Sequence, residues 1–191
     1  MAHLRNIGIA LAASFLLVAA SPAPSKGTNV AIETTAGTIV VRLDTVAAPV
    51  TTKNFLHLVD TGAYNGSSFY RTVSRQREPN SAIEVIQGGL QPKAIVHPIP
   101  VEKTETTGLH NTNGAISMAR TADPVSATSE FFICIGDNTF LDSQKFSDHE
   151  GYAAFGYVVS GYDVVLAINH APAEGQSLTP PIRIVRIRRV R

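Results

Sequence analysis

The chain has 191 residues, of which 44% are hydrophobic and 16% are charged, and its formal net charge is +1 at pH 7. This length fits a single domain with a substantial core, and the composition excludes an intrinsically disordered chain. The near-neutral charge excludes a general attraction to nucleic acids or membrane surfaces, and the single cysteine excludes an internal disulfide.

Residues 1–20 are predicted to form a secretory signal peptide. A short basic start that ends at Arg5 precedes an almost uninterrupted apolar run from Ile7 to Ala20, which is too short to span a bilayer comfortably. Small residues follow the run, as a cleavage site requires, and we expect cleavage after Ala20. A buried helix or a retained anchor is the alternative. The mature protein is therefore expected to be periplasmic or secreted, without membrane contact after cleavage.

Residues 21–29 are expected to form a linker, because they are rich in Pro, Ser and Lys and show no periodicity. Residues 30–191 are then the folded domain. It begins with a predicted hairpin, in which the strands Val30 to Thr34 and Thr38 to Leu43 flank a turn that contains Gly37.

A helix is predicted from Pro49 to Gly62. Proline stands near its start, Thr51 or Thr52 can cap it, and the glycine can end it. A second, short helix is predicted from Tyr162 to Asn169, with apolar residues at helical spacing.

The remaining elements are short strands. They are predicted over Ser68 to Val73, Ile83 to Gln87, Ile116 to Arg120, Phe131 to Ile135, Ala153 to Val159 and Pro181 to Val190. Many short strands with only two helices imply a mainly β fold, in which an antiparallel sheet closes into a barrel.

The strand that contains two adjacent phenylalanines is unusual. Successive side chains of a strand point to opposite faces, so Phe131, Ile133 and Ile135 can fill the barrel. Phe132 and Glu130 then share the outer face, where a half-buried strand would normally show only polar groups. An outward Phe132 either covers a second core or lines a groove.

Motifs for several classes of chemistry are missing. The chain has no G-x-S-x-G elbow, no phosphate loop and no dinucleotide-binding glycine pattern, and its six histidines never fall at metal-ligand spacing. We therefore expect no metal and no cofactor. Arg71 and Gln87 lie on neighbouring predicted strands, and from the pattern alone they form either a solvated face or a site.

Six ordered blocks carry a family resemblance. They are Phe69-Tyr70-Arg71, Val85 to Gly89, Thr112 to Arg120, Ala127 to Ile133, Phe140-Leu141-Asp142 and Phe155-Gly156. Together they resemble the cyclophilin-type peptidyl-prolyl cis-trans isomerases, especially the exported bacterial branch. The resemblance runs from about Val30 to Val190. It implies a closed eight-stranded antiparallel β-barrel capped by two α-helices.

The resemblance implies that Arg71 and Gln87 are catalytic. The guanidinium of Arg71 would hydrogen-bond the prolyl nitrogen as the peptide bond twists, and Gln87 would bind a substrate carbonyl. Phe132 and Leu141, with Val85 at the edge, would hold the proline ring. The matching substrate-binding positions also include Ala119 and Arg120, whose backbone would pair with the peptide as an added strand, and Glu130, Phe140 and Tyr152.

Several positions depart from the family pattern. A long charged loop from Ser74 to Ala82 replaces a short apolar turn, and Glu84 and Val85 stand where the family usually supplies Phe and Met to the pocket. Glu130 replaces a usual Gln. These changes are expected to affect activity or the preferred residue before proline.

Two further departures concern cyclosporin. Phe140 replaces a Trp, and Tyr152 replaces a His of the cyclosporin-sensitive members. Exported bacterial members share both changes, so the resemblance implies weak cyclosporin binding with catalysis retained.

The sequence thus predicts a monomeric exported isomerase whose partners are proline-containing segments of other exported proteins. The first alternative is a cyclophilin-like chaperone module that grips such segments with little or no turnover. The second is a β-barrel carrier with a small molecule inside, although eight strands barely leave room for side chains. The Arg-rich end, from Arg183 to Arg191, is interpreted as an edge strand whose charges discourage pairing.

Overall fold

The computed structural model describes residues 27–90 and 97–191. The predicted signal peptide and most of the predicted linker lie outside the described residues. Strand β1 (Gly27–Thr34) pairs with β2 (Gly37–Asp44) from its first residue, since Gly27 lies opposite Asp44. Residues 27–29, which were expected to be linker, therefore belong to the domain.

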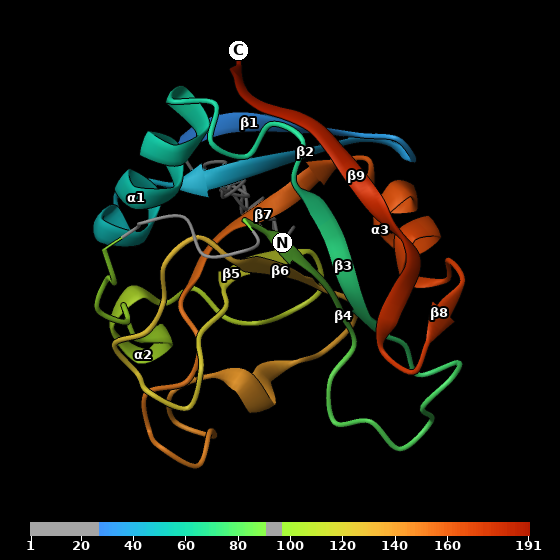
Figure 1. Cartoon of the computed structure of the whole chain (residues 1–191). Coiled ribbons are helices and arrows are strands. Elements are labelled where there is room, and N and C mark those ends of the chain that lie inside the picture. The colour runs from blue at the N-terminus through green and yellow to red at the C-terminus, as the bar shows by residue number, and fades with distance from the viewer. Residues whose placement is uncertain (1–26, 91–96) are drawn as a thin grey trace, which may run out of the picture.

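Eight antiparallel strands close into a barrel (Figure 1). Besides β1 and β2 they are β3 (Ser68–Val73), β4 (Val85–Gly89), β5 (Ala115–Met118), β6 (Phe131–Cys134), β7 (Ala154–Ser160) and β9 (Ser177–Val190). Their order is β1-β2-β7-β5-β6-β4-β3-β9, and pairing of β1 with β9 closes the ring. The short β8 (Ala173–Glu174) pairs only with β9. The predicted fold class is confirmed.

The long strand β9 is not an edge strand, which corrects the interpretation of its arginines. It pairs with β1 on one side and with β3 on the other. Arg186 and Arg188 form ion pairs with Glu33, and Arg189 pairs with Asp60. The arginines are exposed, whereas Ile184 and Ile187 are buried in the barrel, and the alternation is interrupted where the pairing with β1 shifts its register.

Side chains fill the inside of the barrel. Phe131 is fully buried, and its ring meets the rings of Phe55, Tyr64 and Phe69 edge-on at 5.5 to 5.7 Å between centroids. Ile133 packs in the same cluster. A packed aromatic interior of this kind argues against a carrier with a ligand in the lumen.

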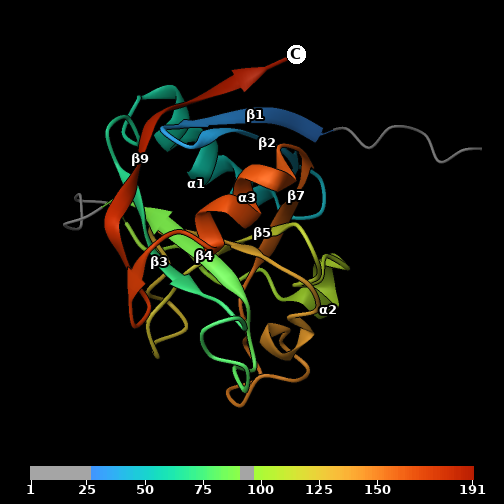
Figure 2. The same ribbon diagram turned by 90° about the vertical axis from the view of Figure 1, so that its right-hand side faces the viewer.

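Helices α1 (Pro49–Asp60) and α3 (Tyr162–Asn169) confirm the two predicted helices. Figures 1 and 2 show them on different sides of the barrel, α1 against β2 and β9 and α3 against β2, β3 and β4. A third helix, α2 (Thr104–Thr107), was not predicted, since four residues are too few to show a helical period. In the described part of the chain, no helix is long and apolar enough to cross a membrane.

The N-terminus of α1 differs from the prediction. Neither Thr51 nor Thr52 caps it, and the N-cap position is Ala48, whose side chain cannot accept a hydrogen bond. Instead the carboxylate of Glu102 accepts the backbone N–H groups of Val50 and Thr51 at 3.0 and 2.8 Å. A residue some fifty positions along the chain thus supplies the cap and the negative charge that a helix N-terminus favours.

Replacing Glu102 with alanine is expected to destabilise the protein by about 1 to 2 kcal/mol, the usual effect of losing an N-cap. The two N–H groups lose their acceptor, and the helix dipole loses its counter-charge. Urea unfolding measures the change. Glu105→Ala is the matched control, because it removes an exposed carboxylate from the same segment. Equal stability of the two variants would contradict a capping role for Glu102.

Candidate active site

A cavity of about 210 Å³ lies on the outer face of the barrel. Its lining brings together eight of the predicted site residues, which come from segments far apart in the sequence. They are Arg71, Val85, Gln87, Ala119, Arg120, Phe132, Leu141 and Tyr152. Ile83 completes the wall.

The two adjacent phenylalanines of β6 lie in different clusters. Phe131 belongs to the barrel core, whereas Phe132 belongs to a smaller apolar cluster with Val85, Ala119 and Leu141. Phe132 is 5% exposed, and its ring meets that of Tyr152 edge-on at 5.7 Å. The outward phenylalanine therefore does both things that the pattern left open, since it covers a second small core and lines a cavity.

A register shift in β3 turns Arg71 toward this cavity. Pairing of β3 with β4 and with β9 shifts between Phe69 and Arg71. Phe69 is buried in the barrel, whereas Arg71 lines the outer cavity and Tyr70 bonds to the cavity residue Gln87. Simple alternation would have placed Phe69 and Arg71 on the same side. A bulge at Tyr70 therefore re-aims the guanidinium, as bulges near active sites often do.

Two glutamine side chains hold the guanidinium of Arg71. Its Nη1 donates to Oε1 of Gln87 at 2.7 Å, and its Nε and Nη2 donate to Oε1 of Gln176 at 2.9 and 2.7 Å. Gln87 in turn donates from Nε2 to the hydroxyl of Tyr70 at 2.8 Å. A guanidinium has five N–H donors, so two remain for a group bound in the cavity.

Arg120 packs against Tyr152, another residue that lines the cavity. Its guanidinium carbon lies 4.8 Å from the ring centroid of Tyr152 and 5.6 Å from that of Phe146. The same group donates to the carbonyl of Gly151 at 2.7 Å and forms an ion pair with Asp148. Only 2% of the Arg120 side chain is exposed, so this cation serves the wall of the cavity and is not free to follow a ligand.

Two titratable groups near the cavity, Asp148 and Cys134, have shifted pKa values. Burial would raise the pKa of Asp148, but hydrogen bonds from the backbone of Glu150 and Gly151 and from Arg120 bring that pKa below its usual value. Burial strongly raises the pKa of the Cys134 thiol, which therefore stays neutral and acts as a small apolar group.

The segment before β4 departs from the prediction that Glu84 occupies a pocket position. Every second residue of this segment points to the same face and lines the cavity, namely Ile83, Val85 and Gln87. Glu84 points away, and its carboxylate accepts the backbone N–H of Arg75 at 3.2 Å and pairs with that guanidinium at 3.4 Å. Ile83 was missed although the same alternation could have revealed it. The cavity thus retains two apolar groups from this segment.

Two predicted site residues, Glu130 and Phe140, are absent from the cavity lining. Phe140 is half exposed, and its ring packs on Phe146 at 5.8 Å. The carbonyl of Glu130 accepts the N–H of Ala119 at 2.8 Å, so that N–H is already bonded and unavailable to an added strand. Contacts of these two side chains with an extended ligand stay predictions.

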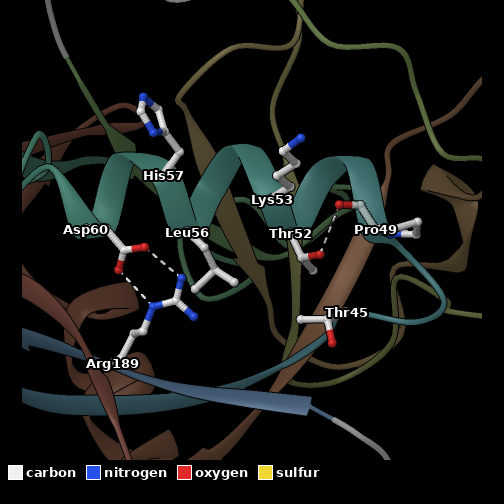
Figure 3. A pocket seen from close by; sticks show the side chains of 8 residues that line it. All are labelled: Thr45, Pro49, Thr52, Lys53, Leu56, His57, Asp60 and Arg189. Carbon is white, nitrogen blue, oxygen red and sulfur yellow. Dashed lines mark hydrogen bonds and ion pairs between the residues drawn. The ribbon is translucent and has the colours of Figure 1, made fainter.

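A larger hollow of about 420 Å³ runs along α1 (Figure 3). Two of its lining residues, Asp60 and Arg189, are joined by two hydrogen bonds of 2.7 Å, and Leu56 lies between the polar groups. None of the matching site residues lies there. The chemistry therefore places the candidate active site at the smaller cavity around Arg71. Within residues 27–90 and 97–191, no three acidic, His or Cys residues are grouped to bind a metal ion.

Comparisons with known proteins identify the family of the chain. A family model described as cyclophilin type peptidyl-prolyl cis-trans isomerase/CLD matches residues 29–189. Peptidyl-prolyl cis-trans isomerase A of Dickeya dadantii is 41% identical over 165 residues, which cover 83% of this chain and 80% of that protein. Peptidyl-prolyl cis-trans isomerase cyp18 of Streptomyces antibioticus is 42% identical over 146 residues, 73% of this chain and 82% of that protein.

The fold has a close counterpart among solved structures. A cyclophilin type peptidyl-prolyl cis-trans isomerase of Cryptosporidium parvum superposes with a TM-score of 0.72. The alignment covers 86% of this chain and 98% of that one at 22% identity, a level at which the likeness concerns the fold alone.

Proposed function

This chain belongs to the cyclophilin-type peptidyl-prolyl cis-trans isomerases, and we propose that it accelerates X-Pro isomerisation in exported proteins with Arg71 as the catalytic residue. The observation that carries the catalytic assignment is the guanidinium of Arg71, which lines a cavity together with the apolar side chains of Phe132 and Leu141 and has two N–H donors uncommitted.

The chemistry needs no nucleophile. Rotation about a peptide bond faces a barrier of about 18–20 kcal/mol, because the nitrogen lone pair is conjugated with the carbonyl. In the twisted state that lone pair is localised on the nitrogen and can accept a hydrogen bond from Arg71. Neither planar isomer offers the same acceptor, so the guanidinium stabilises the transition state more than the substrate.

The other cavity residues bind the substrate in this proposal. Phe132, Leu141 and Val85 hold the proline ring, supported by their place in one apolar cluster beside Arg71. Gln87 uses one amide hydrogen on Tyr70 and keeps the second for a substrate carbonyl.

One experiment tests catalysis directly. Exchange between the cis and trans forms of an Ala-Pro peptide is followed by NMR with and without the protein, and we expect clear acceleration at catalytic concentrations. Peptide binding without acceleration would leave only a binding module. Uncatalysed exchange takes tens to hundreds of seconds, so the comparison has a slow baseline.

The exported setting rests on the first twenty residues, which have the order of segments of a cleavable signal peptide. When the full chain is expressed in a bacterium, we expect a processed protein that begins at Ser21 in the exported fraction. We also expect a monomer, since a closed barrel offers no long strand edge for pairing. Native mass spectrometry of the exported fraction gives both the mass of the processed chain and its oligomeric state. A cytoplasmic product that retains Met1 would contradict export, and a dimer mass would contradict the monomer.

A further inference from the structure

The long charged loop between β3 and β4 is anchored to the body of the protein. Arg77 donates from Nη2 to the carbonyl of Asn169 at 2.9 Å and from Nη1 to that of Ala171 at 3.4 Å. These carbonyls lie at the C-terminus of α3, where a helix favours a cation. Arg75 holds the other side of the loop through its ion pair with Glu84. The loop is therefore tied to the body of the protein on both sides.

This anchored loop reaches Arg71 through one intermediate side chain. The carboxylate of Glu78 accepts a hydrogen bond of 3.0 Å from Nε2 of Gln176, and Oε1 of Gln176 accepts two from Arg71. The backbone carbonyl of Gln176 also accepts the N–H of Thr72 at 2.8 Å, which holds the residue beside β3.

Glu78 determines which way the amide of Gln176 points. A carboxylate can only accept hydrogen bonds and a guanidinium can only donate them. The amide NH₂ must therefore face Glu78, and the amide oxygen must face Arg71. Without an acceptor at position 78, only the guanidinium itself orients the amide, which is then held less firmly; a donor at that position would draw the amide oxygen away from Arg71.

We propose that Gln176 and Glu78 are positioning residues that hold the guanidinium of Arg71 in its catalytic orientation. The inference rests on the proposed catalytic role of Arg71. Gln176 and Gln87 accept hydrogen bonds from the guanidinium on two sides. The orientation of its two remaining N–H groups is therefore set. An Arg side chain free to rotate would have to be ordered at each turnover, which lowers the rate of the chemical step.

A series at position 78 tests the orientation argument. Glu78→Gln keeps an acceptor for Gln176, and we expect it to retain most of the wild-type kcat. Glu78→Ala removes the acceptor, and we expect an intermediate loss. Glu78→Lys offers a donor that draws the oxygen of Gln176 away from Arg71, and we expect kcat to fall about tenfold. The Kd of an Ala-Pro peptide is expected to change less than about twofold, because position 78 does not line the cavity.

A double-mutant cycle and a control complete the experiment. In a Gln176→Ala background, Glu78→Lys is expected to cause no further loss, since the residue through which it acts is gone. Glu174→Lys makes the same charge change at an exposed position of the neighbouring strand β8, and we expect it to match wild type. Thermal unfolding verifies that each variant is folded.

Two results would overturn the inference. One is a wild-type kcat for Glu78→Lys, and the other is an equal loss from Glu78→Lys with and without Gln176. Both leave the role of Arg71 intact if Arg71→Ala is inactive. If Arg71→Ala is as active as wild type, the catalytic assignment fails first, and the inference fails with it.

Discussion

Replacing Arg71 with alanine is expected to lower kcat/KM for an Ala-Pro peptide by about 10²- to 10³-fold, the usual effect of removing one preorganised donor from a transition state. The variant keeps the apolar side chains of the cavity, so peptide binding should fall far less than the rate. Exchange spectroscopy on the peptide gives the rate, and titration of the same peptide gives the Kd.

Two further variants make this result specific. Arg71→Lys keeps the positive charge but loses the planar guanidinium that donates to the two glutamines. We expect its kcat/KM to remain well below that of wild type. Arg183→Ala removes an exposed guanidinium from β9 and should leave the rate unchanged. Equal rates for wild type and Arg71→Ala would remove Arg71 from the mechanism.

The largest expected effect on stability belongs to Phe131. Truncation to alanine should cost about 3 to 5 kcal/mol, because it opens a cavity where three other aromatic rings meet a fully buried side chain. Domains of this kind are stable by only about 5–15 kcal/mol, so the loss is a large part of the whole. Urea unfolding monitored by circular dichroism measures it.

The neighbouring Phe132 provides the contrast. It packs in the smaller outer cluster and lines the cavity. Phe132→Ala should therefore destabilise the protein less than Phe131→Ala and weaken peptide binding about tenfold or more, since the proline ring loses its main apolar contact. If Phe132→Ala proved the more destabilising of the two and left the Kd unchanged, the assignment of the two rings would be wrong.

Much of the fold was predictable because it is encoded in local patterns. Alternation along β6 separates Phe131 from Phe132, and the Pro and Gly residues around α1 mark its limits to within two residues. The ordered blocks then identified the family and most of the cavity. Local patterns succeed here because side-chain direction and backbone preference depend on the nearest few residues.

The site was less predictable wherever one segment acts on another. Alternation alone would have turned Arg71 to the same side as Phe69, and only the register shift at Tyr70 brings it to the cavity. Position in the family pattern suggested Glu84 as a pocket residue, but its side chain forms an ion pair with Arg75 and does not line the cavity. Ile83 lines the cavity instead.

The barrel, its two main helices, the family and the guanidinium that we propose to be catalytic could all be predicted from the sequence. The way in which that guanidinium is held could not, because it depends on contacts between distant segments. Gln176 lies 105 positions from Arg71 in the chain, and Glu102 caps a helix that begins some fifty positions earlier. Such contacts depend on barrel closure, strand register and loop anchoring, which arise from the whole chain and which no local period records.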